Sequence, residues 1–190
     1  MLILVRHGQT TANAAGLLLG RLDPELTETG RTQAEAVARR LGRVDRVISS
    51  PLRRARATAA ALGQPVDVDD RWIEIDYGSY DGVPLAEVPA DVWDAWRRDP
   101  RFALPGGESL AAVGERVRRA CEDLRAEAAD RDVVVVSHVS PIKAGVAWAL
   151  GAGDDVSWRM FLDVGAICRV QVGPRGPSLR SYNDTSHLVS

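Results

Sequence analysis

The sequence predicts an α/β fold, a three-layer α-β-α sandwich around a mostly parallel central sheet. Apolar runs without polar alternation, such as LILV at 2–5 and VVVV at 133–136, are typical of strands buried on both faces. Amphipathic stretches of helical length separate these runs, as parallel strands require. The 190 residues, 45% of them hydrophobic, can bury a sizeable core. We therefore expect one domain over 1–190, with a short lid region at about 75–107.

The first half of the chain alternates strands and helices. After the strand at 2–5 we expect an amphipathic helix at 27–42, with Thr27 or Thr29 as its cap and Gly42 at its end. A second strand, DRVISS, leads to a helix over 51–62, where Pro51 suits the first turn. The segment VDVDDRW at 66–72 holds a short third strand.

The second half begins with an irregular region rich in Gly, Pro and Trp, which includes a short helix around 90–98. We expect Trp93 and Trp96, three residues apart in it, to roof a pocket. The elements predicted after it are a long helix at 108–129, a buried strand at 132–138, a helix at 141–150 and strands at 166–173 and 178–183.

Composition narrows the class of protein. The net charge of −2 and the pI of about 5.9 argue against binding to nucleic acid or an anionic membrane through charge. The only cysteines, Cys121 and Cys168, suit buried, reduced thiols in a cytoplasmic protein. The N-terminus does not have the pattern of a signal peptide, and no apolar run has the length of a membrane span. No close Cys/His cluster indicates a metal, so no cofactor is predicted.

Polar residues follow each predicted strand. The first strand ends at Arg6 and His7, and the fourth ends at His138. The second strand ends at two serines with arginines just beyond, and the third ends near Glu74. Because the carboxyl ends of parallel strands meet at one edge of a sheet, these side chains are predicted to form one site.

Two histidines and at least two arginines make a cationic pocket. The planar guanidinium fork suits phosphate oxygens. Gly8 at the strand–helix junction would let backbone N–H groups approach the anion, and the helix that follows would add its positive end. Phosphate is therefore the predicted ligand.

The same residues can turn a phosphate ester over. A neutral histidine fixed in one tautomer can attack phosphorus, and neighbouring arginines lower its pKa. The leaving alkoxide needs a proton. Glu74 lies among apolar residues beside Trp72, where burial favours its protonated form, and Asp76 and Asp81 are less favoured alternatives.

Five segments in this order resemble the histidine phosphatase superfamily, which has the phosphoglycerate-mutase-like fold. They are LVRHGQTTAN, SSPLRRARATA, WIEIDYGSYDG, PGGES and VVVVSHVSPIKA, and GLLLGRLDPELTETGRTQA resembles the segment after the first. The resemblance covers nearly the whole chain and favours the phosphatase branch.

The resemblance implies a role for each matching residue. His7 would be the nucleophile that becomes phosphohistidine, and Glu74 would protonate the leaving group and then activate water. The residues implied to hold the phosphoryl oxygens are Arg6, Arg54 and His138, helped by Asn13. Arg54 matches the motif better than Arg53 or Arg56, because it directly precedes Ala55 and Thr58 of RARAT.

On the substrate side, the resemblance implies Gly8, Thr10, Gly20 and Val139, although Thr10 also suits a helix cap. Val139 departs from the family's usual Gly, and its side chain would narrow the pocket. His187 is expected to be structural. Whether Arg97, Arg98 or Arg101 of the lid faces inward stays open.

Three functions remain. The first is a metal-independent phosphomonoesterase acting on small phosphorylated metabolites. The second is a phosphomutase, which shares the phosphohistidine but, in the family, carries a longer insertion after the acid motif. The third is a non-catalytic module that binds a phosphorylated ligand, which would be expected to have lost His7, Arg54 or Glu74. The short cover between Glu74 and Gly107 favours the phosphatase. The oligomeric state stays open.

Overall fold

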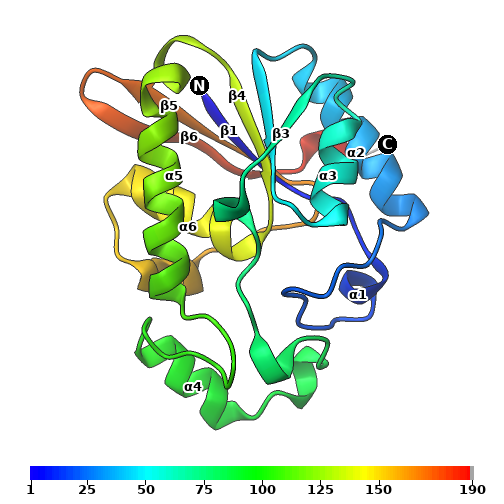
Figure 1. The fold of residues 1–190 in the computed structure, drawn as a ribbon, viewed down its shortest axis with the longest axis vertical. Coiled ribbons are helices and arrows are strands. Elements are labelled where there is room, and N and C mark those ends of the chain that lie inside the picture. Colours follow the sequence, from blue (N-terminus) through cyan, green and yellow to red (C-terminus); the bar gives the residue numbers. More distant parts are fainter. Residues whose placement is uncertain (189–190) are drawn as a thin grey trace.

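The computed structural model describes residues 1–188 and contains a six-stranded sheet in the order β3-β2-β4-β1-β5-β6 (Figure 1). The strands are β1 (Leu2–Arg6), β2 (Arg46–Ser49), β3 (Val66–Val68), β4 (Val133–Ser137), β5 (Ile167–Gly173) and β6 (Gly176–Asp184). The first four are parallel, and β5 and β6 form an antiparallel hairpin at one edge. The predicted three-layer fold with a mostly parallel sheet is confirmed.

Helices cover both faces of the sheet (Figure 1). The helices that pack on the sheet are α2 (Glu28–Leu41), α3 (Arg53–Ala60), α5 (Leu110–Asp130) and α6 (Val139–Leu150). Along β1, Leu2 and Leu4 join the core beneath α5 and α6, while Ile3 and Val5 join the core beneath α2 and α3. Both faces of the strand are therefore buried, which is why β1 and β4 read as continuous apolar runs.

Local signals set most helix ends. The Thr27 hydroxyl accepts the Gly30 N–H and caps α2, and Gly42 ends it with a φ of 63°. Pro51 lies before α3, which begins at Arg53, so the expected first-turn role of Pro51 is wrong. The expected short third strand is present as β3, and it is followed by a 3₁₀ turn, η1 (Asp70–Trp72), which the Asp69 side chain caps by accepting the Arg71 N–H.

The 75–107 segment leaves the sheet as one excursion. It contains η2 (Gly78–Tyr80), η3 (Leu85–Glu87) and the predicted short helix α4 (Ala90–Arg98). Its two ends meet at a neck, where the Glu108 N–H donates to the Asp76 carbonyl at 2.8 Å. Gly78 is required there, because a Cβ would lie 2.2 Å from the Pro105 carbonyl oxygen.

The remaining short elements are α1 (Thr11–Ala14), η4 (Asp154–Arg159) and η5 (Ser186–Leu188). Within residues 1–188, none of the helices has the length and apolar character needed to cross a bilayer.

Candidate active site

Two histidines meet at the carboxyl ends of neighbouring strands. β1 pairs with β4 in parallel register, with Arg6 opposite Ser137, so the next residue of each strand is a histidine at the same level. The rings of His7 and His138 have centroids 5.1 Å apart and an interplanar angle of 57°. Both side chains are buried. The predicted meeting of the two imidazoles is thus present.

The His7 ring is held in one tautomer. Its Nδ1 lies 2.7 Å from the Gly8 carbonyl oxygen, which can only accept, so Nδ1 carries the hydrogen and Nε2 keeps the lone pair. Burial, and then the charges of Arg54 and Arg6, hold the pKa of His7 well below 6.5. His7 therefore has the protonation state of a nucleophile.

His138 is held in the opposite tautomer. The Arg54 Nε donates to its Nδ1 at 3.2 Å, so the ring hydrogen lies on Nε2, which is 2.7 Å from the Ser50 hydroxyl oxygen. Burial, and then the Arg54 charge, hold the pKa of His138 well below 6.5. The second imidazole is a neutral donor.

Arg54 is fully buried and holds the loop in front of it. Its two terminal nitrogens donate to the carbonyls of Leu22 and Gly20 at 2.7 and 2.8 Å. The Asp81 carboxylate fastens the same loop by accepting the N–H groups of Gly20, Arg21 and Leu22, each at 2.8 Å. Asp81, the alternative acid, positions this loop and does not line the cavity described below, whereas Glu74 does.

Glu74 lies at the N-terminal end of α6. Its Oε2 accepts the Val139 N–H at 3.0 Å, and its Oε1 accepts those of Ser140 and Ile75 at 3.1 and 2.8 Å. A carboxylate is favourable there, because the first N–H groups of a helix lack intrahelical partners. From the sequence, Glu74 is expected near the end of the third strand. In the structure Glu74 instead follows η1. Asp76 accepts the Gly78 N–H and is not part of the pocket lining.

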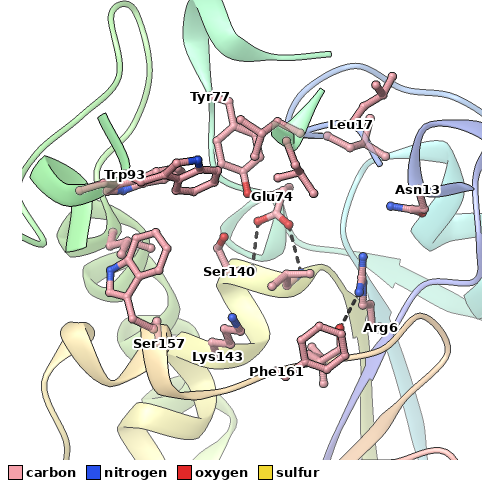
Figure 2. Close-up of a pocket in the computed structure, with 18 of the residues that line it drawn as sticks. Arg6, Asn13, Leu17, Glu74, Tyr77, Trp93, Ser140, Lys143, Ser157 and Phe161 are labelled. Carbon is pink, nitrogen blue, oxygen red and sulfur yellow. Dashed lines mark hydrogen bonds between the residues drawn. The ribbon is translucent and has the colours of Figure 1, made fainter. Parts of the chain in front are cut away.

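A cavity of about 270 Å³ opens in front of these groups (Figure 2). Of the predicted residues, it is lined by Arg6, His7, Asn13, Glu74 and Val139. The Asn13 Oδ1 accepts both donors of Thr10, which leaves the amide nitrogen as a donor on the cavity side (Figure 2). The Arg6 Nη1 donates to the Leu162 carbonyl at 2.6 Å, which fixes the guanidinium at the cavity wall.

Five predicted residues lie outside this lining: Gly8, Thr10, Gly20, Arg54 and His138. Arg54 and His138 stand behind His7 with no exposed surface. Gly8 serves close packing, because a Cβ there would lie 2.2 Å from the Gly30 carbonyl oxygen, and its N–H donates to the Thr58 hydroxyl. Thr10 caps α1. The expected helix end beside Gly8 is therefore wrong, and the helix end that reaches the site is that of α6.

The sequence interpretation missed one wall of the cavity. Trp158 and Phe161 come from the loop around η4, and Tyr77, Ser140, Ser157 and Lys143 also line the cavity with the expected Trp93 and Trp96. Trp93 and Trp96 stack at 5.7 Å between centroids. One signal was available: Lys143 is the only lysine among the 24 Lys and Arg residues, and it follows Val139 by one helical turn.

The three lid arginines whose direction was left open, Arg97, Arg98 and Arg101, are exposed and do not line the cavity. Arg97 lies over the rings of Trp93 and Trp158, at 5.8 and 5.7 Å from their centroids, and pairs with Asp94. Within the described residues, no three His, Cys, Asp or Glu side chains gather as a metal ion would require.

The two depressed histidine pKa values predict a pH response. We expect His7 and His138 to stay uncharged as the pH falls from neutral through 6.5, whereas the unfolded chain takes up protons there. Because the unfolded state binds more protons, the free energy of unfolding falls as the pH drops from 6.5 towards the folded pKa values. Imidazole NMR titration with parallel unfolding curves tests this. A midpoint near 6.5 for either ring would contradict it.

The fold and the site define a class: an α/β protein with two neutral histidines, arginines and a helix-capping glutamate at the strand ends. The sequence profile of the histidine phosphatase superfamily (branch 1) matches residues 2–185. This chain belongs to that superfamily.

The chain is also similar to proteins named as phosphatases. The chain is 35% identical to phosphoserine phosphatase 1 of Hydrogenobacter thermophilus, over 98% of this chain and 93% of that protein. It superposes with a TM-score of 0.91 on a mutant phosphoserine phosphatase from Entamoeba histolytica in complex with phosphoserine, at 30% identity, covering 99% of this chain and 98% of the other.

Another relative is longer. A bifunctional protein of Mycobacterium tuberculosis is 37% identical over 98% of this chain, which spans only 54% of that protein. The chain thus spans about half the length of the first curated relatives that it matches.

Proposed function

We propose that this chain is a metal-independent phosphomonoesterase that acts on small phosphorylated metabolites through a phosphohistidine on His7. One observation carries the proposal: a buried, neutral His7 with a free Nε2 lines a cavity that also holds the donors of Arg6 and Asn13. Relatives named phosphoserine phosphatase support this substrate class.

The reaction follows from this geometry in two steps. The His7 Nε2 attacks phosphorus, so a P–N bond forms and the ester P–O bond breaks, while Glu74, which must carry a proton when the ester is bound, gives that proton to the leaving oxygen and becomes the carboxylate. Glu74 then takes a proton from water, whose oxygen attacks phosphorus and breaks the P–N bond. The Gly8 carbonyl, which accepts the Nδ1 hydrogen, stabilises the positive ring while it carries the phosphoryl group.

Arg6 and Asn13 would hold the phosphoryl oxygens directly. Arg54 donates three of its N–H groups to protein acceptors and retains two of the five that a guanidinium carries. We assign those two, with the Nε2–H of His138, to the phosphoryl oxygens nearest His7. This assignment requires the Ser50 hydroxyl to release His138 when phosphate binds.

The excursion at 75–107 is proposed as the lid of a single catalytic domain. Its length favours hydrolysis over phosphoryl exchange, because a short cover leaves water access and few contacts for a bisphosphate. Cys121 and Cys168 are buried free thiols, which supports a cytoplasmic location.

The test is hydrolysis of an aryl phosphate in the presence of a chelator. We expect unchanged turnover, because the nucleophile and the cationic groups are all side chains. Quenching with denaturant at alkaline pH should trap enzyme-bound phosphate, and later acidification should release it, as expected of an acid-labile phosphohistidine. Phosphorus NMR on phosphorylated metabolites then distinguishes free phosphate from a rearranged ester. Loss of activity with the chelator, or a rearranged ester as the main product, would contradict the proposal.

A further inference from the structure

Lys143 presents an ammonium group to the cavity from α6. It lies one turn beyond Val139, whose N–H donates to the Glu74 carboxylate, and both side chains line the same cavity. Figure 2 shows Lys143 on the cavity side of the helix, near Ser140 and Ser157. The lysine is therefore placed about one helical pitch, ~5 Å, from the N-terminal turn that Glu74 caps.

This ammonium has no partner within residues 1–188. No carboxylate lies within 4.0 Å of it and no hydrogen bond to it is formed, whereas most of the chain's arginines are paired. The nearby carboxylate of Glu74 is occupied by three backbone N–H groups. Burial lowers the pKa of Lys143, and the Glu74 charge opposes that effect. A partly buried ammonium that lines the cavity without a protein partner leaves its donors available to a ligand.

The other groups around Lys143 narrow what that ligand can be. Trp93, Trp96, Trp158 and Phe161 offer ring faces, and Ser140 and Ser157 offer hydroxyls. Arg6 is the other cation in the lining, and the phosphoryl group already requires it beside His7. Lys143 is thus the one lining cation left for a second negative charge, while the lid arginines face elsewhere.

We propose that Lys143 binds a carboxylate of the substrate, so that the enzyme selects phosphate esters of small hydroxy acids over the same esters without the acid group. This inference rests on the proposed phosphatase function. Lys143 lies one helical turn from Val139, which binds Glu74, and both side chains line the same cavity, so one small ligand can contact the two groups at once. Lysine suits a carboxylate, because its flexible stem carries a compact charge with three donors.

Two matched substrate pairs test the proposal. O-phosphoserine carries a carboxylate that O-phosphoethanolamine lacks. In the second pair, 3-phosphoglycerate has a carboxylate where glycerol 3-phosphate has an alcohol. For the wild type we expect kcat/KM to be about 10- to 100-fold higher for the acid of each pair, since a lost charged hydrogen bond has this size. The difference should lie mainly in KM.

The variants Lys143→Met and Lys143→Arg complete the design. Lys143→Met keeps an unbranched side chain but removes the charge. The ratio of kcat/KM for the acid to that for its carboxylate-free partner should therefore fall to within about 3-fold of unity. Turnover of the carboxylate-free esters and of an aryl phosphate should be retained. Lys143→Arg should keep most of the preference. A Lys143→Met variant that retains the preference, or that loses all substrates equally, would overturn the proposal.

A measurement without turnover separates the two hypotheses. In His7→Ala, reductive methylation with ¹³C-formaldehyde labels the single lysine and the N-terminal amine. The lysine signal should shift with 3-phosphoglycerate and stay constant with glycerol 3-phosphate. This shift tests carboxylate binding even if the wild type proves inactive, a result that would count against the phosphatase function alone. An unchanged lysine signal with the acid would overturn the role of Lys143.

Discussion

Replacing His7 with alanine is expected to lower kcat/KM for every phosphomonoester by at least about 10⁴-fold, because no other group can take the phosphoryl group. Within the described residues, the other lining side chains carry hydroxyls, cationic or amide donors, ring faces, alkyl groups or the Glu74 carboxyl group, and none of them is an imidazole. His138 cannot substitute, because Arg54 donates to its Nδ1 and its Nε2 carries the hydrogen.

Three measurements make this result specific. His7→Ala quenched at alkaline pH should carry no bound phosphate, while its thermal unfolding midpoint should stay close to that of the wild type. His187→Ala is the matched control, because its Nε2 bonds the Gly165 carbonyl and it does not line the cavity. We expect this control to retain activity within about 3-fold. Substantial turnover by His7→Ala would remove the phosphohistidine from the mechanism.

The second large effect is expected for Glu74→Gln, and it should depend on the leaving group. For alkyl phosphates kcat should fall by about 10²- to 10⁴-fold, because an alkoxide leaves poorly without a proton. For aryl phosphates the fall should be about 10-fold or less, because a phenolate is a weaker base. The measurement is a series of esters that differ only in leaving-group basicity.

This substitution also has a structural effect that must be measured. Both carboxylate oxygens accept N–H groups from the α6 terminus, and the glutamine amide turns its NH₂ towards one of them. A loss of about 1–3 kcal/mol in the free energy of unfolding is expected from the unpaired donor. Asp76→Asn makes the same chemical change outside the cavity and should retain activity. Equal losses on alkyl and aryl esters would contradict the acid role of Glu74.

The sequence contained much of this architecture. Because β1 and β4 are buried on both faces, their apolar runs identified them, and the parallel arrangement then placed His7 and His138 at one edge. The short helix at 90–98 was also expected and matches α4. These features could be predicted because each depends on the order of apolar and polar residues within a single segment of the chain.

The unpredicted features depend on segments that are far apart. Glu74 caps a helix that begins 65 residues later, and Arg54 holds carbonyls of a loop more than 30 residues before it. Phe161 and Trp158 reach the cavity from beyond α6. The sequence interpretation did not single out Lys143, because no local pattern shows which helix face meets a cavity.

The neck of the 75–107 segment has a consequence for how such enzymes diversify. Because the Asp76 carbonyl and the Glu108 N–H meet, the chain departs from and rejoins the scaffold at nearly one point. A segment of different length or composition can be grafted between these residues while His7, His138 and α6 stay in place, provided that the graft keeps Asp81, which anchors the 20–22 loop. The catalytic groups and the lid wall of the cavity can thus be inherited separately, and chimaeras made at this junction should exchange the lid wall while the preference assigned to Lys143 stays with α6.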